Sequence, residues 1–204
     1  MRDQTISGFL EQLASRVPAP GGGATAALHA AQSAALLTMV ARYSDGAKYD
    51  AELMGHIIAE ADGLRNDALT LAESDEEAFA AVAEAYRLPK ETAEQKEVRS
   101  AAVAEALAGA ARPQADVIRL ALLLVSFAEE LLRAGNRNMI TDVAAAAEAA
   151  RAAAGTAQLF IEVNLRGMKD PAVRAETAAM AEVTDEVTAR ADRVVAAVRE
   201  EISR

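Results

Sequence analysis

The stretch ATAALHAAQSAALLTMVARYS, residues 24–44, decides the fold. It is small or apolar on almost every side, and no charged residue occurs in it before Arg42. Alanine has the highest helix propensity of all residues. A helix that is apolar all round is stable only when other elements cover it. We therefore expect residues 24–44 to form the central and most buried helix of a helical bundle.

The composition of the whole chain agrees with this expectation. Hydrophobic residues make up 52% of the 204 residues, but aromatic residues only 3%. The core must therefore be built from Ala, Leu, Val and Ile, and the β-branched and aromatic residues are too scattered to indicate a sheet. We predict an all-α fold, a single-domain bundle of long and short helices that spans residues 1–204.

Caps, prolines and glycines divide the rest of the chain into further predicted helices. Their ranges are from Asp3 or Thr5 up to residue 16, then 50–88, 92–132, 138–154, 156–165, and 171 to the C-terminus. A capping box at Ser74 and Glu77 allows a new start within the second of these, and Pro113 allows a kink in the third. Gly155 is expected to end a helix. These signals predict about seven to nine helices.

Charge and residue usage exclude several classes of function. The net charge of −10 and the pI of about 4.8 argue against a general nucleic-acid or anionic-membrane surface. The absence of Cys excludes disulfides, thiolate zinc sites and Cys nucleophiles. His29 and His56 lack ligand-spaced partners, so we predict no metal site. The apolar run 120–127 is far too short to span a bilayer, and residues 1–16 lack the apolar core of a signal peptide, so we expect a cytoplasmic protein.

The most informative local feature is PAPGGG, residues 18–23. Its glycines, Gly21, Gly22 and Gly23, expose backbone N–H groups where the predicted central helix begins. A helix N-terminus carries unpaired donors and a partial positive charge, which suits an anionic or carbonyl-rich ligand. The alternative is a turn that merely joins two helices.

Polar residues in two other segments are candidates for chemistry. The segment NRNMITD, residues 136–142, places Asp142 one helical turn after Asn138 in an otherwise Ala-rich region, where Asp is a poor helix former. N-capping by Asn138, Thr141 or Asp142 is the alternative. The segment SDEE, residues 74–77, offers three carboxylates or simply a solvated first helical turn.

Asn164 is a third polar candidate, because its amide stands among apolar neighbours in IEVNL, residues 161–165. An amide in such a position either points inward, toward a cleft, or caps the end of a helix.

Taken in order along the chain, five segments resemble the cyclodeaminase/cyclohydrolase family. That family includes the C-terminal domain of formiminotransferase-cyclodeaminase and free-standing methenyltetrahydrofolate cyclohydrolases. The segments are FLEQLASRVPAPGGGATAAL, ALLTMVARYSDGAKY, ESDEEAFAAVAEAYRLPK, GNRNMITDVAAAA and FIEVNL. No single segment is specific for the family, but the occurrence of all five in this order over residues 5–165 is. Two positions depart from the usual pattern: Ala24 and Thr25 follow the glycines where Ser is common, and Thr141-Asp142 replaces Ser-Asp.

The resemblance implies an all-α homodimer that binds a tetrahydrofolate substrate. The first function it implies is formiminotetrahydrofolate cyclodeaminase, which forms 5,10-methenyltetrahydrofolate and ammonia. The alternative is 5,10-methenyltetrahydrofolate cyclohydrolase, and a further alternative is a non-catalytic folate-binding or assembly bundle. Both reactions need an acid or base near the one-carbon unit, and neither needs a metal or redox cofactor.

The resemblance also implies roles for individual residues. Asp142 is the first candidate for the acid/base carboxylate and Asp75 the second, while Lys48 is placed to bind the carboxylate tail of folate or to act as an acid. The predicted substrate-binding residues are Gly21, Gly22, Gly23, Asn136, Asn138, Thr141 and Asn164. If the chain is an enzyme, Asn136, Asp142 and Asn164 are expected to converge on one cleft.

Overall fold

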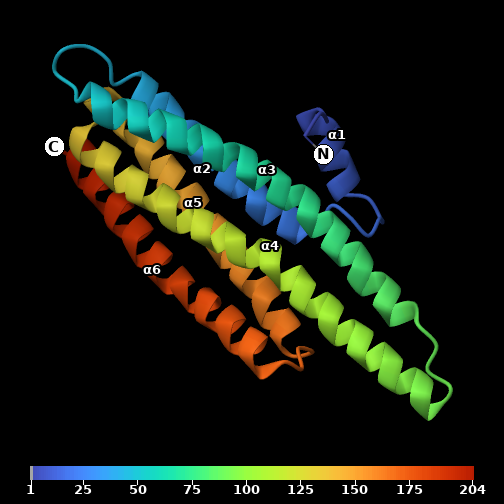
Figure 1. The fold of residues 1–204 in the computed structure, drawn as a ribbon. Coiled ribbons are helices and arrows are strands. Elements are labelled where there is room, and N and C mark those ends of the chain that lie inside the picture. The colour runs from blue at the N-terminus through green and yellow to red at the C-terminus, as the bar shows by residue number, and fades with distance from the viewer. Residues whose placement is uncertain (1) are drawn as a thin grey trace.

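Helices are the only regular elements in the computed structural model, which describes residues 2–204. They are α1 (Ile6–Leu13), α2 (Gly22–Arg42), α3 (Ala51–Arg87), α4 (Ala93–Ala134), the 3₁₀ helix η1 (Arg137–Met139), α5 (Ile140–Leu165) and α6 (Pro171–Ile202). The helices from α2 to α6 lie alongside one another as a bundle, and the short α1 stands apart from it (Figure 1). The all-α prediction is confirmed.

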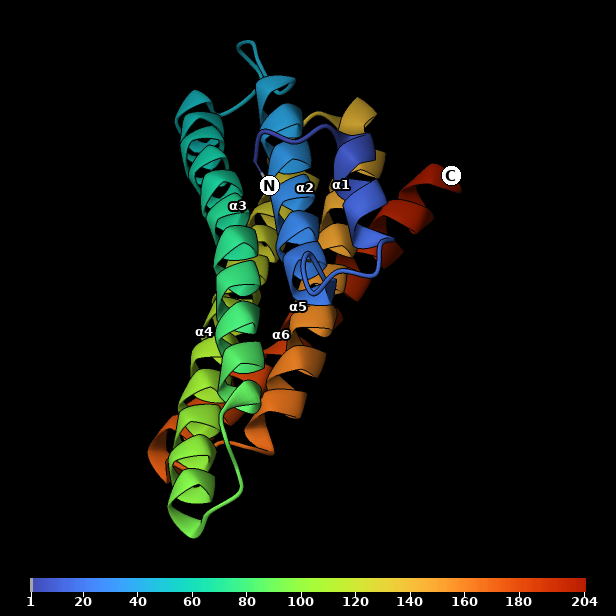
Figure 2. The same cartoon turned by 90° about the vertical axis from the view of Figure 1, so that its right-hand side faces the viewer.

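The predicted central helix corresponds to α2, which packs against α3, α4 and α5. Figure 2 shows it between α3 and α5. More than half of its 21 residues are buried, a larger share than in any other α-helix within residues 2–204. The alanines Ala26, Ala27, Ala30 and Ala34 have no exposed surface, which lets neighbouring helices approach closely. The prediction that this is the most buried helix is confirmed.

By length and composition α2, rather than residues 120–127, is long and apolar enough to cross a membrane. However, 61% of its apolar stretch is buried inside the bundle. This burial is what a core helix requires, because its apolar surface is covered by other helices instead of lipid.

The helices are fewer and longer than the predicted seven to nine. The structure has six α-helices and one 3₁₀ helix within residues 2–204. Neither Ser74 nor Pro113 starts a new helix, because α3 and α4 each run through as one element. The predicted stop at Gly155 is wrong, since α5 continues through it. A glycine inside a helix costs only about 1 kcal/mol, which burial of the neighbouring Ala153, Ala154 and Ala157 offsets.

Most helix starts follow the predicted caps. The Thr5 hydroxyl accepts a hydrogen bond from the Gly8 N–H at 3.1 Å. Thr92 and Gln95 form the predicted capping box at the start of α4. Pro171 occupies the first turn of α6, where its missing N–H has no helical partner to lose.

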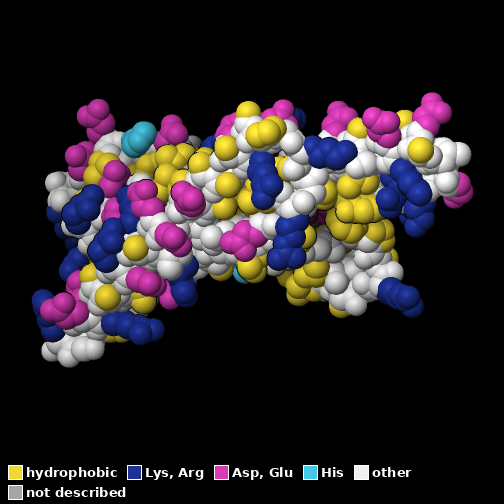
Figure 3. All heavy atoms as spheres, turned by 90° about the horizontal axis from the view of Figure 1, so that it is seen from below, with side chains coloured by type: hydrophobic (Ala, Val, Ile, Leu, Met, Phe, Trp, Pro, Cys, Tyr) yellow, Lys and Arg dark blue, Asp and Glu magenta, His cyan; other side chains and the backbone are white. Residues whose placement is uncertain are grey.

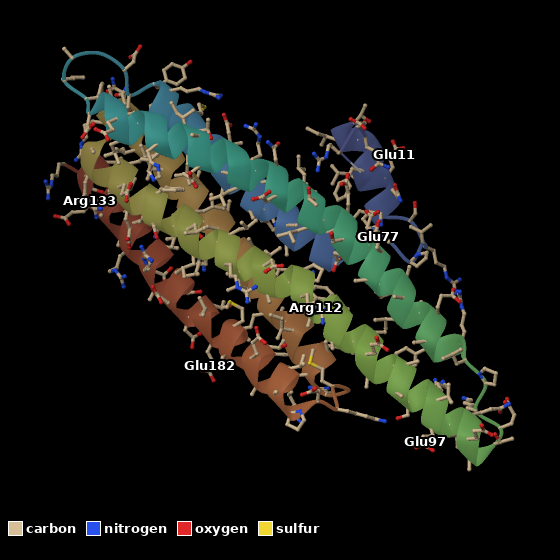
Figure 4. All side chains as sticks on the ribbon, viewed as in Figure 1. Glu11, Glu77, Glu97, Arg112, Arg133 and Glu182 are labelled. Carbon is tan, nitrogen blue, oxygen red and sulfur yellow. The ribbon has the colours of Figure 1, made fainter. Side chains whose placement is uncertain are left out.

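Two features of the bundle bear on the site. The end of α3 and the start of α4 project beyond the other helices, and Figure 4 places Glu97 and Arg133 near opposite ends of α4. Farther along, α4 is fastened to α6 by an ion pair, in which Arg190 donates to Glu129 at 3.1 and 2.6 Å. This ion pair holds α6 in place away from the projecting end.

Candidate functional site

A cleft of about 310 Å³ lies where the N-terminus of α2 meets α3, α4 and α5. Most of its wall is apolar, and Asp75 is the only carboxylate among its lining residues. Figure 3 shows hydrophobic side chains gathered over the half of the molecule in which α3 and α4 project. The lining residues are Pro18, Ala19, Gly21, Gly22, Gly23, Asp75, Phe79, Val82, Tyr86, Leu107, Ala110, Phe160, Val163 and Asn164.

Two of the predicted glycines are required by close packing against the cleft. A Cβ atom on Gly23 would lie 2.2 Å from Asp75 Oδ1, and one on Gly22 would lie 2.6 Å from Phe160 Cζ. Both distances are far below van der Waals contact. The absence of side chains at these two positions therefore lets the Asp75 carboxylate and the Phe160 ring approach the start of α2.

The N-terminus of α2 lacks a cap from its own N-cap residue, Gly21. The Asp75 carboxylate, which comes from α3, accepts a hydrogen bond from the Ala24 N–H instead. A negative charge at this end of a helix is favourable because of the free N–H groups and the helix dipole. The Thr25 hydroxyl donates to the Gly21 carbonyl at 3.0 Å, so it is occupied within the same turn.

A residue that the sequence analysis did not select, Gln114, completes the surroundings of Asp75. Its Nε2 donates a hydrogen bond to Asp75 Oδ1 at 2.6 Å, and its side chain is almost fully buried in α4. The signal was present in the sequence, because Gln114 is an amide directly after Pro113 and before the apolar run of α4. The prediction at this point of the chain concerned only Pro113, as a possible kink.

The environment of Asp75 changes its acidity. Burial raises the pKa of this carboxyl above its ordinary value, and the charge of Glu76 raises it further. The hydrogen bonds from Gln114 and Ala24 oppose these effects because they stabilise the ionised form. A cleft carboxyl with a raised pKa is suited to exchange protons closer to neutral pH than an ordinary Asp.

Asn164 is the fifth predicted residue that the structure places in the cleft. It lies near the end of α5, beside Phe160 and Val163 of the same wall. The cleft thus brings together Gly21, Gly22, Gly23, Asp75 and Asn164 from three helices and the segment before α2.

The other predicted residues lie at the opposite end of the bundle. Asp142 and Asn164 are both on α5, and a helix rises about 1.5 Å per residue, so they are separated by about 33 Å. Asn136 binds the end of α2, with its Nδ2 donating to the Tyr43 carbonyl at 2.8 Å. The predicted convergence of Asn136, Asp142 and Asn164 on one cleft is therefore wrong for a single chain.

Three further candidates share this distant end. Asn138 and Thr141 are exposed, and the Asn138 N–H donates to the Asn136 side chain at 3.1 Å. Lys48 lies in the loop between α2 and α3, with its Nζ 4.8 Å from the centre of the Tyr49 ring. None of the three is among the residues that line the cleft.

The capping interpretation of Asn138, Thr141 and Asp142 does not hold either. The N-cap of α5 is Met139, and no side-chain bond caps this helix. Asp142 stands half-buried in the first turn. Its predicted acid/base role stays a prediction, and capping does not explain its presence.

The described residues 2–204 contain no group of three or more His, Cys, Asp or Glu side chains that could hold a metal ion. The polar side chains among the residues that line the cleft are one carboxylate, one amide and one phenol, from Asp75, Asn164 and Tyr86, and the backbone of the α2 N-terminus borders the same space. Such a set can bind a polar heterocycle and move a proton.

Comparisons with known proteins identify relatives of the chain. A family model described as formiminotransferase-cyclodeaminase matches residues 5–183. The methenyltetrahydrofolate cyclohydrolase of Methylorubrum extorquens is 37% identical over 177 residues, and the match covers 85% of each chain. The formimidoyltransferase-cyclodeaminase of Mus musculus is 31% identical, and the match covers 86% of this chain but only 33% of that relative.

A solved structure has the same fold. The crystal structure of formiminotetrahydrofolate cyclodeaminase from Thermotoga maritima superimposes with a TM-score of 0.87 and covers 98% of both chains. The sequence identity is 26%.

Proposed function

The chain belongs to the formiminotransferase-cyclodeaminase family, and from this premise we propose that it is a folate one-carbon enzyme, 5,10-methenyltetrahydrofolate cyclohydrolase. The observation that carries the proposal is the match to the Methylorubrum extorquens cyclohydrolase, which extends over 85% of both chains. The order of the two enzyme hypotheses is thus the reverse of that in the sequence analysis. Formiminotetrahydrofolate cyclodeaminase is the second candidate, favoured by the Thermotoga maritima structure.

The cleft has the chemistry that a methenyltetrahydrofolate needs. The ring system of methenyltetrahydrofolate is flat and its faces are largely apolar, which suits contact with the rings of Phe79, Tyr86 and Phe160. Its edges carry amide-like donors and acceptors, which suit the Asn164 amide and the free N–H groups at the start of α2. The methenyl bridge carries a positive charge, and Asp75 supplies the one negative charge of the lining.

We assign the proton transfers to Asp75. In the cyclohydrolase reaction a water oxygen bonds to the methenyl carbon, and Asp75 accepts a proton from that water. The bond from this carbon to N5 then breaks, Asp75 returns its proton to N5, and the hydroxyl proton leaves to solvent as the formyl group forms on N10. One water is consumed and one proton is released. In the cyclodeaminase reaction the same carboxyl would accept the N10 proton and protonate the departing ammonia.

We further propose that neither reaction uses a metal or redox cofactor, because each step is an addition, an elimination or a proton transfer that a carboxyl group can support. The cytoplasmic location is likewise kept as a proposal, and cell fractionation tests it.

A homodimer is the third part of the proposal. Asp142, Asn136 and Lys48 lie about 30 Å from the cleft of their own chain, judged from the length of α2 and α5. If they act in the reaction, they reach a cleft only from a second copy whose helices run in the opposite direction. Sedimentation at micromolar concentration tests the dimer, and mixing Asp75 and Asp142 variants tests whether two copies share a site.

The central experiment assays purified protein with 5,10-methenyl- and 5-formiminotetrahydrofolate side by side. Hydrolysis of the first without ammonia release from the second supports the cyclohydrolase, and the reverse result supports the cyclodeaminase. Turnover of neither substrate would refute the enzyme proposal and leave the non-catalytic alternative.

Variants then assign the carboxylate. Asp75→Asn is expected to lower turnover on the order of 10²-fold, as for other losses of general acid–base catalysis. Glu77→Gln is the matched control, because Glu77 is exposed on the same helix and does not line the cleft. Near-normal turnover in Asp75→Asn together with a large loss in Asp142→Asn would move the role to Asp142. Circular dichroism must show that each variant keeps its helical fold.

A further inference from the structure

Gln114 combines two features that a packing residue in an Ala- and Leu-rich helix does not need. Only 1% of its surface is exposed, yet its side chain is fully polar at the tip. Its Nε2 bonds the Asp75 carboxylate at 2.6 Å, whereas its Oε1 is buried and has no hydrogen-bond partner among the described residues.

This arrangement is unfavourable for stability alone. A buried polar atom without a partner costs about 1–3 kcal/mol, and an apolar side chain of the same shape would avoid that cost. The bond to Asp75 is therefore the reason for an amide at this position. The carboxylate is held by Gln114 from α4 and by the Ala24 N–H from α2, with Gly23 directly against it.

The two donors differ in what they can do when Asp75 takes up a proton. A backbone N–H can only donate, so Ala24 serves the ionised carboxylate. A side-chain amide carries donors on one side and an acceptor on the other. After a rotation of about 180° about the Cγ–Cδ bond, Oε1 of Gln114 would face the carboxyl group and accept its O–H. The atom that lacks a partner is thus the one that the protonated state needs.

We propose that Gln114 is the positioning residue of Asp75 in both of its protonation states, donating through Nε2 to the carboxylate and accepting through Oε1 from the carboxylic acid. This inference rests on the proposed function of Asp75 as the proton-transfer group. Gln114 itself does not line the cleft, so it acts through Asp75 and not on the substrate.

Few other titratable groups face Asp75. Glu76, its neighbour on α3, raises the pKa of Asp75 through its charge. Tyr86, also on α3, is the other titratable residue that lines the cleft, and the lining residues of α2, α4 and α5 carry no ionisable side chain. A change in the pH dependence of turnover after a substitution at position 114 can therefore be assigned to Asp75.

The first test is Gln114→Met, which keeps the length and shape of the side chain and removes both polar atoms. We expect turnover at neutral pH to fall about 10-fold or more, since a charge-assisted hydrogen bond contributes about 1.5–3 kcal/mol. Loss of the bond raises the pKa of Asp75, so the acid limb of the pH–turnover profile moves to higher pH. Thermal stability is expected to change little, because the loss of this bond is offset by removal of the buried Oε1 that lacks a partner.

Thr184→Val is the matched control. Its hydroxyl on α6 is also buried without a partner, but it lies outside the cleft. The thermal stability of this variant should be unchanged or higher, because its hydroxyl makes no hydrogen bond that could be lost. Its turnover and the pH dependence of turnover should match those of the unmodified chain.

The second test uses the unmodified chain and is independent of how any variant folds. In an NMR titration the side-chain amide signals of Gln114 should change with the same midpoint as the carboxyl carbon signal of Asp75. The inference would be overturned if the Gln114 amide signals did not change as Asp75 titrates. It would also be overturned if Gln114→Met had normal turnover and the acid limb of its pH–turnover profile stayed in place. If Asp75→Asn is itself fully active, the proposed function fails. If Asp75→Asn is inactive while Gln114→Met is normal, only the present inference fails.

Discussion

Substituting Gly23 by Ala tests whether the position of the Asp75 carboxylate matters for the reaction. The new Cβ atom would lie 2.2 Å from Oδ1 and 2.5 Å from Oδ2 of Asp75. Carbon and oxygen atoms in contact are normally at least about 3.4 Å apart, so the carboxylate must move by about 1 Å or more. Because Gly23 is itself buried in the first turn of α2, the central helix of the bundle, the Asp75 side chain moves more easily than the backbone does.

The magnitude follows from this displacement. A misplacement of about 1 Å in a reacting group lowers turnover on the order of 10²-fold. The stability effect is smaller, because two terms oppose each other. Ala in place of Gly favours the helix by about 1 kcal/mol, while a Gln114 amide that has lost its partner costs about 1–3 kcal/mol. The free energy of unfolding is therefore expected to change by no more than about 2 kcal/mol.

The assay compares Gly23→Ala with Gly63→Ala, using steady-state turnover and urea unfolding. Gly63 is an exposed glycine of α3, and a Cβ atom there would meet nothing within 4 Å. This control should gain about 1 kcal/mol of stability and keep its turnover. Turnover of Gly23→Ala within about twofold of the unmodified chain would refute the reasoning, because it would show that the reaction tolerates a displaced Asp75 carboxylate.

Four further predictions concern pH, ions and stability. Turnover should fall with acid through a limb that lies above the ordinary range of an Asp, because burial raises the pKa of Asp75 and the base must be ionised. A limb at the ordinary value would contradict this. Incubation with a chelator should leave turnover unchanged, and a loss restored by added metal would show a cofactor. Arg190→Leu should lower the free energy of unfolding by about 1–3 kcal/mol at neutral pH, because it removes the hydrogen-bonded partner of the partly buried Glu129 and leaves only the more distant Arg193. The ion pair lowers the pKa of Glu129, so its contribution to stability is lost as the pH falls through that lowered pKa. Urea unfolding at decreasing pH should therefore show a shrinking difference in free energy of unfolding between the variant and the unmodified chain. Arg99 lies over the Tyr86 ring of the cleft, where its charge can attract the carboxylates of a polyglutamated folate. Arg99→Ala should therefore raise KM for this substrate several-fold at low salt and leave kcat unchanged. An equal rise in KM at high salt would exclude an electrostatic cause.

Part of the site could be predicted because it depends on local sequence. The three glycines mark the start of α2, and a helix start exposes N–H groups wherever it lies in the fold. Asn164 stood out as an amide among apolar residues and Asp75 as one of three neighbouring carboxylates, and both line the cleft. The position of Gln114, beside Pro113 and ahead of the apolar run of α4, marked it as a polar residue next to the core, but its role depends on a residue 39 positions away and could not be predicted from local sequence.

The sequence by itself determined the helical class, the central helix and most helix starts. Propensity, periodicity and capping act between residues that are at most a few positions apart, so they can be read along the chain. Residues 24–44 had to be covered because no side of that helix is polar. The family resemblance could also be recognised from the order of five short segments.

Only the tertiary structure decided which polar residues meet. It joined Asp75 to Gln114 and the α2 N-terminus and placed Asp142 about 33 Å from Asn164 on the same straight helix. It also decided that α5 continues through Gly155, because burial of the flanking alanines outweighs the small local preference of a glycine for a helix end. Contacts between helices depend on how whole faces pack, and that packing is set by the bundle and not by neighbours in sequence.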